Sequence, residues 1–423
     1  MAGRITVTTC NDYDSGMLMC FAAASHAVYT LPPDKLAKAI ALSHAQVLAH
    51  FGGVVWRLLV LWLLIRSGAG AWLRDRAARI IHRRWLQGFL IAPAWLLIVS
   101  LIELPIALLM ERVYHTYGIS IEPWTMWFGD YAKSLGLTLI VGTFAIVVLY
   151  GLMRRSPRRW WLWFWVLAIP CEVLAVFVVP ILIDPLFDRF SPLATRDPAL
   201  VQQLERVAQR GHLDISPGRM FVMDASAKVT APNAYVTGFG ASKRIVVWDT
   251  TLNLESNDEI LAMYGHEQGH YVLHHIYLGM LFSFAAMLVF FWIASRLLQW
   301  IVRRFSSAWG IPSIEDWSSV GVVLLLMTIL GFLAEPVGNA FSRWEEHAAD
   351  VYGQEVLHEL VADPQATCVD SFQKLGELWL DDPQPNPFVV FWTYSHPSIA
   401  ERVRFAASYD PWPPGHAPKY VRQ

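Results

Sequence analysis

Charged residues and cysteines are both scarce in this chain of 423 residues. Only 16% of the residues are charged, against about 25% in an average soluble domain, and the formal net charge is −2. Nothing in this balance indicates a nucleic-acid partner. The cysteines Cys10, Cys20, Cys171 and Cys368 lie far apart without CXXC spacing, so the sequence indicates neither a disulfide framework nor a cysteine metal site. An arrangement typical of a serine or cysteine nucleophile is missing as well.

Apolar residues, in contrast, make up 55% of the chain, and 20 residues are tryptophan. This composition is too apolar for an ordinary soluble protein, so a lipid bilayer is the expected surrounding. A helix needs about 20 apolar residues to cross a membrane. Six segments reach or approach that length: 47–65, 88–110, 137–153, 160–183, 276–294 and 320–334. The sequence therefore predicts a mainly α-helical, polytopic membrane protein.

Arginines gather in alternate connections between these segments, and their positions predict the orientation. The first, third and fifth connections contain Arg66, Arg74, Arg76, Arg79, Arg83, Arg84, Arg154, Arg155, Arg158, Arg159, Arg303 and Arg304. Short arginine-rich loops stay on the cytoplasmic side. Residues 184–275 and the tail after Glu335 are then expected on the opposite side, as in a bacterial inner-membrane protein that faces the periplasm.

Three charged residues, Arg57, Glu103 and Glu172, fall inside the predicted spans. Charges are costly in hydrocarbon and normally face the bundle interior or a water-filled cavity. Two interpretations stay open: a structural pairing among the three, or a path for a substrate.

The N-terminal segment, residues 1–46, contains an apolar run at residues 17–27 that is too short to span a bilayer. This run resembles the hydrophobic region of a signal peptide that ends in small residues, with Met17 as an alternative start. The alternatives are a weak first membrane helix and a buried surface segment.

The most informative motif is His266-Glu267-Gln268-Gly269-His270, an HEXXH sequence. On a helix, its two histidines lie on one face and can bind a single zinc ion, with Glu267 beside them as a general base. Ser256 and the acidic residues after it predict the start of that helix. Gly269 costs about 1 kcal/mol of helix propensity, which indicates close packing against another backbone.

The surrounding segments predict a small α+β layer outside the membrane. Residues 201–210 have the pattern of a helix, and residues 219–224 and 244–248 have that of strands. A strand before a zinc-binding helix can hold an extended peptide by main-chain hydrogen bonds, although such strands can also be purely structural. The acidic stretch 339–350 can supply a third zinc ligand, and its spacing leaves Glu345, Glu346 and His347 all open.

Six short motifs follow one another through the second half of the chain. They are DPLFDRF at 184–190, NAY at 233–235 with GF at 238–239, RIV at 244–246 with DT at 249–250, HEQGH at 266–270, N-x-x-S-R-x-x-E-x-x-A-D at 339–350, and SHPS at 395–398 with Arg402. In this order they resemble the integral-membrane zinc metallopeptidases typified by the type I CAAX prenyl protease. A heat-shock-induced bacterial inner-membrane protease is a more distant relative.

The resemblance implies roles for individual residues. Glu346 matches the third zinc ligand beside His266 and His270, and Asp350 matches the carboxylate that orients a ligand imidazole. His396 matches the histidine that stabilises the oxyanion. Asn233, Ala234 and Tyr235 match the edge strand along which substrates lie. Arg402, which matches only by pattern, is expected to be a structural partner of an acidic residue near the site.

The implied fold is a transmembrane helix bundle with a zincin-like α+β metalloprotease domain, divided into residues 1–46, 47–184, 185–275, 276–335 and 336–423. The implied activity is that of a zinc metalloendopeptidase with one Zn²⁺ per chain, in which Glu267 activates water and peptide or protein is the substrate. An envelope quality-control protease is the alternative, and a catalytically silent scaffold or a transporter is a further one. The sequence predicts no oligomeric state.

Overall fold

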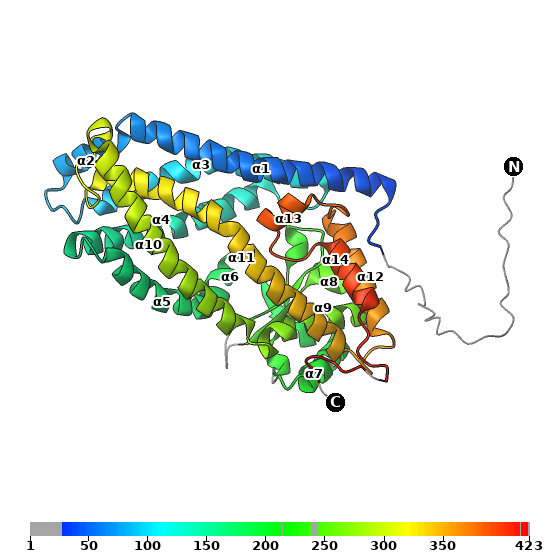
Figure 1. Ribbon diagram of the computed structural model, residues 1–423. Helices are drawn as coiled ribbons and strands as arrows, with labels where there is room; N and C mark the ends of the chain where they lie inside the picture. The colour runs from blue at the N-terminus through cyan, green and yellow to red at the C-terminus, as the bar shows by residue number, and fades with distance from the viewer. Residues whose placement is uncertain (1–27, 214, 239–242, 415, 422–423) are drawn as a thin grey trace, which may run out of the picture.

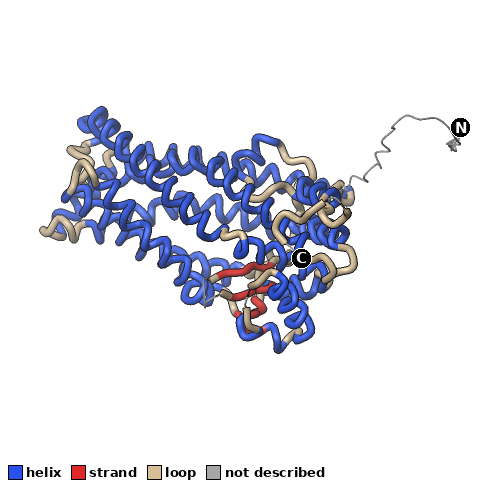
Figure 2. The backbone as a smooth tube through the Cα atoms, turned by 60° about the horizontal axis from the view of Figure 1, so that its bottom comes forward, coloured by secondary structure: helices blue, strands red, loops and turns tan. Residues whose placement is uncertain are grey.

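The computed structural model describes residues 28–213, 215–238, 243–414 and 416–421 (Figure 1). The predicted signal-like segment at residues 17–27, with its alternative start at Met17, lies outside the described residues. Helices dominate the described part, and a small sheet lies at one end of the long helices (Figure 2).

Within the described residues, five helices are long and apolar enough to cross a membrane. They are α1 (Pro33–Arg66), α3 (Gly88–Tyr117), α4 (Trp124–Arg155), α10 (His275–Trp309) and α11 (Val320–Val356). A sixth span is formed if α5 (Trp160–Val178) is joined to the π-helix Val179–Ile183 and α6 (Asp184–Phe187) across a bend of 48°. Pro180, which has no N–H to continue the α-helical ladder, lies at this bend. Each of the six predicted apolar segments lies within one of these elements, so the predicted polytopic fold is confirmed.

Several helices extend well beyond the apolar segments that revealed them. Helix α1 begins at Pro33, and α4 begins at Trp124. Helix α11 continues past Pro336 without interruption and includes the whole acidic stretch 339–350. The segments on either side of residue 336 therefore share one helix, and a short helix α2 (Ala69–Ile80) links α1 to α3.

Large aromatic side chains fill the core of the bundle at the end where α2 lies. Trp95 and Trp317 are almost fully buried, and the ring of Tyr150 stacks on Trp317 at 4.6 Å between centroids. Of the charged residues predicted within the spans, Arg57 Nη2 lies 2.7 Å from Glu103 Oε1. Glu172 accepts a hydrogen bond from the Ser283 hydroxyl at 3.2 Å. Structural pairing is thus observed for Arg57 with Glu103.

The sheet has the strand order β1-β2-β4-β3 and mixes two kinds of pairing. Its strands are β1 (Phe190–Pro192), β2 (Met220–Met223), β3 (Ala234–Thr237) and β4 (Arg244–Trp248). Strands β2 and β4 are parallel, whereas β1 with β2 and β3 with β4 are antiparallel. Strand β3 therefore forms one edge of the sheet. The predicted strands at 219–224 and 244–248 are confirmed, and β1 was not predicted.

Six further helices of the described chain lie beside the sheet and the long helices. They are α7 (Pro198–Arg210), α8 (Asp249–Leu254), α9 (Asn257–Val272), α12 (Pro364–Trp379), α13 (Pro387–Thr393) and α14 (Ile399–Ser408). Helix α9 begins with a capping box in which Ser256 and Glu259 satisfy each other's backbone N–H groups, as its sequence predicts. Figure 1 shows α10 and α11 running from the end marked by α2 to the end marked by α9.

Candidate metal centre

The site lies where α9 crosses α11, and glycines allow the two backbones to approach closely. A Cβ added to Gly269 would lie 3.1 Å from the Cα of Ala349, and one added to Gly353 would lie 2.8 Å from the backbone nitrogen of His266. The prediction that Gly269 packs against another backbone is therefore confirmed. This close contact fixes the distance between the HEXXH helix and the acidic helix.

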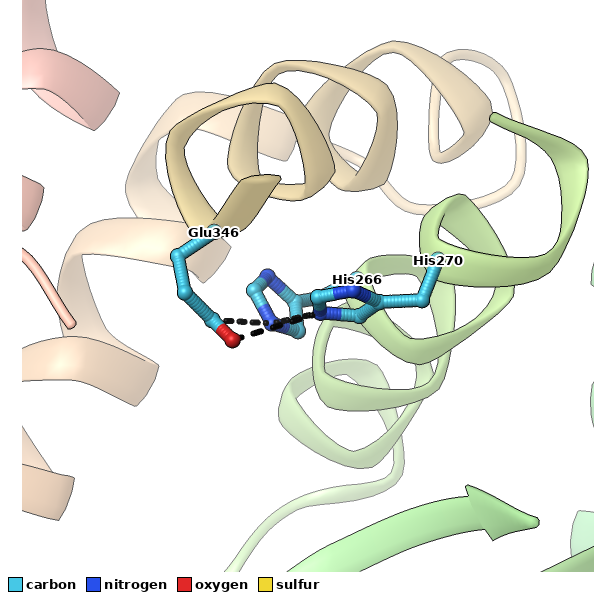
Figure 3. Close-up of side chains that lie close together, drawn as sticks. All are labelled: His266, His270 and Glu346. Atoms are coloured by element: carbon cyan, nitrogen blue, oxygen red, sulfur yellow. Dashed lines mark hydrogen bonds and ion pairs between the residues drawn. The ribbon is translucent and has the colours of Figure 1, made fainter. Parts of the chain in front are cut away.

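Three donor groups converge at the crossing (Figure 3). The Nε2 atoms of His266 and His270 lie 3.2 Å apart. Glu346 places Oε2 3.1 Å from His266 Nε2 and Oε1 3.6 Å from His270 Nε2. Within the described part of the chain, this is the one group of histidine, cysteine or acidic side chains compact enough to hold a metal ion. The helical spacing of the HEXXH motif has thus placed both imidazoles on one face, as expected.

The acidic stretch offered three candidates for a third donor, and the rotation of α11 separates them. Glu346 faces the histidines and is buried. The ring of His347 packs edge-on against Phe405 with 4.8 Å between centroids, away from the cluster. Glu345 lies on the side of α11 that faces Gly279 of α10.

A buried ion pair supports His266 from behind. Asp350, one turn after Glu346 on α11, places Oδ1 2.8 Å from Nδ1 of His266. Arg402 on α14 donates two hydrogen bonds to Asp350, from Nε at 3.0 Å and from Nη2 at 2.6 Å. Burial alone would raise the pKa of Asp350, but the charge of Arg402 and the contact with His266 hold that pKa well below its ordinary value. Arg402 is therefore the structural partner of an acidic residue near the site.

The second histidine has a different neighbour, which the sequence analysis missed. Nδ1 of His270 lies 3.0 Å from Nδ1 of His275, the first residue of α10. His275 is only 4% exposed. Its place five residues after His270 was a signal in the sequence, but that spacing alone does not bring two imidazoles together.

The electrostatics of the cluster are those of a site prepared for a cation. Burial opposes a charge on each member, yet the hydrogen bond from His266 and the nearby imidazoles lower the pKa of Glu346 to about 2. For His266, burial is outweighed by the contacts with Asp350 and Glu346, which raise its pKa to about 10. Burial and the neighbouring His266 lower the pKa of His270 to about 3. The carboxylate of Glu346 thus lies where the two Nε2 atoms converge, a position that suits a cation.

Glu267 and His396 lie at the same cluster. Burial raises the pKa of Glu267 to about 7, although the charge of His266 acts in the opposite direction. A pKa near 7 is the value suited to a general base. The Nε2 atom of His396, on the loop before α14, lies 3.3 Å from Glu346 Oε1. Its side chain is 55% exposed, so it can reach a ligand from the open side.

A cavity of about 480 Å³ lies against the cluster and connects it to the sheet. Glu267 and His396 line it, together with Asn233 and Ala234. The side chain of Tyr235 points across β4 toward β2, where its hydroxyl lies 4.0 Å from the sulfur of Met223. The backbone N–H of Val236 points to Glu267 Oε2 at 3.4 Å, so the outer side of β3 faces the cavity.

The donor set fits a divalent metal. Two imidazole nitrogens and one carboxylate are a ligand set that leaves a position open in a tetrahedral zinc site. Oε2 of Glu346 is buried without a hydrogen-bond partner, although it lies within ion-pair distance of His266. Both imidazoles have a neighbour at Nδ1, which leaves their Nε2 atoms directed at the common centre.

The helix bundle and the donor cluster define an integral-membrane metalloprotease, and comparisons with known proteins support this class. The family model described as peptidase family M48 matches residues 194–410, and that described as the CAAX prenyl protease N-terminal part, with five membrane helices, matches residues 25–189. The chain therefore belongs to the M48 metalloproteases of the CAAX prenyl protease type. Membership of this family implies a metal cofactor and a peptide substrate.

Individual relatives agree over most of the chain. The uncharacterized metalloprotease YhfN of Bacillus subtilis is 33% identical over 378 residues, which are 89% of this chain and 86% of the relative. CAAX prenyl protease 1 of Saccharomyces cerevisiae is 27% identical over 323 residues, covering 72% of this chain and 68% of that protein. The crystal structure of S. mikatae Ste24p matches the fold with a TM-score of 0.77 over 90% of both chains at 24% identity.

Proposed function

We propose that this protein is a zinc metalloendopeptidase with one Zn²⁺ per chain, held by His266, His270 and Glu346. The observation that carries the proposal is the convergence of these donors beside Glu267, with one ligand atom of each residue within 4.8 Å of those of the other two. When bound, zinc would lower the pKa of a water molecule and polarise the scissile carbonyl.

The other steps belong to side chains of this protein. Glu267 removes a proton from the attacking water and later gives it to the leaving amine, which its raised pKa favours. His396 donates a hydrogen bond to the oxyanion that forms when the carbonyl is attacked. Asp350 holds His266 in the orientation in which Nε2 faces the centre, and Arg402 holds Asp350.

The substrate peptide lies along the outer edge of β3. An edge strand offers unpaired backbone groups that can hold an extended chain, and the cavity beside β3 leads directly to Glu267. Asn233 and Ala234 contact the peptide from the cavity wall. Tyr235 pairs through its backbone with β4 and supports the edge from within the sheet.

The natural substrates are peptides at the outer face of a bacterial inner membrane. Arginine-rich connections lie at the end of the bundle opposite the donor cluster, which by the positive-inside rule directs the cluster to the periplasm. Cleavage of damaged envelope proteins suits this location. The relatives include CAAX prenyl protease 1 of Saccharomyces cerevisiae and a CAAX prenyl protease 1 homolog of Dictyostelium discoideum, so a prenylated C-terminal peptide is the second substrate class to test.

The deciding experiment measures zinc content and peptide cleavage on the full chain in detergent. Glu267→Gln is expected to retain about one zinc per chain and to lose cleavage by about 10²–10⁴-fold, since only the proton transfer is removed. Glu346→Ala should lose zinc. His347→Leu, a change on the same helix that faces away from the cluster, serves as the matched control and should behave like wild type. Cleavage by Glu267→Gln at the wild-type rate would exclude this mechanism. Offering a prenylated and an unmodified peptide side by side separates the two substrate classes.

A further inference from the structure

The turn between α9 and α10 places a histidine directly behind one member of the metal centre. Helix α9 ends at Val272, and α10 begins only three residues later at His275. His274 in this turn has a φ of 61°, the left-handed region that a residue with a side chain seldom adopts. This reversal directs His275 back under the last turn of α9, where Nδ1 of its ring lies 3.0 Å from Nδ1 of His270.

The hydrogen-bonding needs of His270 determine what this contact can be. An imidazole that binds a metal through Nε2 carries its proton on Nδ1, which must be donated to an acceptor when the ring is buried. For His266, this acceptor is the carboxylate of Asp350. For His270, the atom in the corresponding place is Nδ1 of His275.

We propose that His275 is the positioning residue of the metal centre that accepts the Nδ1 proton of His270 and thereby directs Nε2 of His270 to the metal. This inference rests on the proposed zinc site and adds a residue to it. His275 is 4% exposed and forms no ion pair with a carboxylate in the described part of the chain, so a neutral imidazole is the form that fits its place.

A neutral acceptor has a physical advantage at this position. The centre already contains the carboxylates of Glu267, Glu346 and Asp350, and of these only Asp350 has a buried arginine as its partner. Another carboxylate behind His270 would add an uncompensated buried charge, which is costly. An imidazole accepts the same hydrogen bond without adding charge.

The contact also joins the metal centre to a membrane-spanning helix. His275 begins the 35-residue α10, whereas His270 belongs to α9 outside the span. The two metal-binding histidines are thus supported by different elements: His266 by α11 and α14, and His270 by the first residue of α10. Loss of either support should weaken zinc binding while the donors themselves remain.

The test measures zinc affinity of the full chain in detergent by competition with a chromophoric chelator, together with thermal unfolding of the zinc-free protein. His275→Leu fills much of the same volume but cannot accept a hydrogen bond, and it should weaken zinc affinity by about 10–100-fold. His275→Asn places a carbonyl oxygen near the position of Nδ1, so its affinity should stay within about threefold of wild type. His275→Ala provides a second variant without an acceptor. The control His347→Leu should bind zinc like wild type.

The outcomes separate this inference from the proposed function. Rescue by Asn but not by Leu or Ala, with similar unfolding temperatures of the zinc-free variants, would establish the acceptor role. Equal zinc affinity of wild type, Leu and Ala would overturn it, and so would an Asn variant as weak as Leu, because packing alone would then explain the loss. A wild-type chain that binds no zinc would instead refute the proposed function, and the role of His275 with it.

Discussion

The buried pair of Asp350 and Arg402 offers a quantitative test of how the centre is held together. Asp350 accepts two hydrogen bonds from Arg402 and lies 2.8 Å from His266 Nδ1. Arg402 is 7% exposed, and its guanidinium lies 4.2 Å from the ring centroid of Phe372. We consider Asp350→Asn, Arg402→Met and the double variant.

Removing one partner of a buried ion pair leaves an uncompensated charge, which costs about 3–5 kcal/mol of unfolding free energy. Asp350→Asn leaves Arg402 without a carboxylate partner, and we expect a loss of about 4 kcal/mol. Arg402→Met leaves Asp350 with His266 as a compensating neighbour, so its loss should be near the lower limit, about 3 kcal/mol. The double variant buries neither charge, and its loss should be smaller than the sum by about 2–3 kcal/mol.

The assay is reversible unfolding of the zinc-free protein in mixed micelles, followed by tryptophan fluorescence, with zinc affinity measured in parallel. Asp350→Asn and the double variant should both bind zinc about 10–100-fold more weakly, because each lacks the carboxylate behind His266. If the two single losses add to that of the double variant within about 0.5 kcal/mol, the pair is not coupled and the reasoning is refuted.

Two further predictions concern stability. Gly269→Ala should lower the unfolding free energy by about 1–3 kcal/mol, because its Cβ would lie 3.1 Å from the Cα of Ala349. The control Gly129→Ala on α4, whose Cβ would have nothing within 4 Å, should not lower the unfolding free energy. Equal effects of the two substitutions would contradict the close crossing of α9 and α11. Burial, and after it the neighbouring Glu259, raises the pKa of Glu255 from an ordinary 4.5 to about 7. The contribution of Glu255 to the unfolding free energy is therefore fully present below about pH 4.5 and is lost as the pH rises through 7. Glu255→Gln should therefore gain up to about 2 kcal/mol above pH 7 and little at pH 4, as pH-dependent unfolding would measure; parallel pH profiles of variant and wild type would contradict this.

Much of the fold could be predicted because its signals are local. An apolar run of membrane-spanning length defines a helix without reference to the rest of the chain, and all six predicted segments lie in helices or in the bent pair. The capping residues Ser256 and Glu259 likewise predicted the start of α9. Strand β1 escaped prediction because three residues that include a proline have almost no strand signal of their own.

The donor set was only partly predictable. HEXXH spacing fixes His266 and His270 relative to each other, since both lie on one helix. The choice of Glu346 over Glu345 and His347 depends on the rotation of α11 against α9, which the contacts of Gly269 and Gly353 determine. From the residues alone that choice stayed open, and a family resemblance was needed to make it.

The contact of His275 could not be predicted from spacing. On a continuous helix, a residue five positions after His270 would lie about 140° around the helix axis from it, so His275 would face away from His270. The contact exists only because the chain leaves the helix at Leu273 and reverses at His274. Such a turn depends on where α10 enters the bundle, which is a property of the tertiary structure.

The continuity of α11 makes the thickness of the bilayer a variable of the site. At 1.5 Å per residue, its 37 residues extend over about 55 Å, whereas the hydrocarbon core measures about 30 Å. One continuous helix, with Pro336 in its interior, is therefore embedded in lipid at one end and carries Glu346 and Asp350 at the other. Hydrophobic mismatch changes the tilt of a spanning helix. In a helix as long as α11, a change in tilt of a few degrees displaces Glu346 by about an ångström. Reconstitution into lipids of different acyl-chain length should accordingly change zinc affinity without any change in sequence.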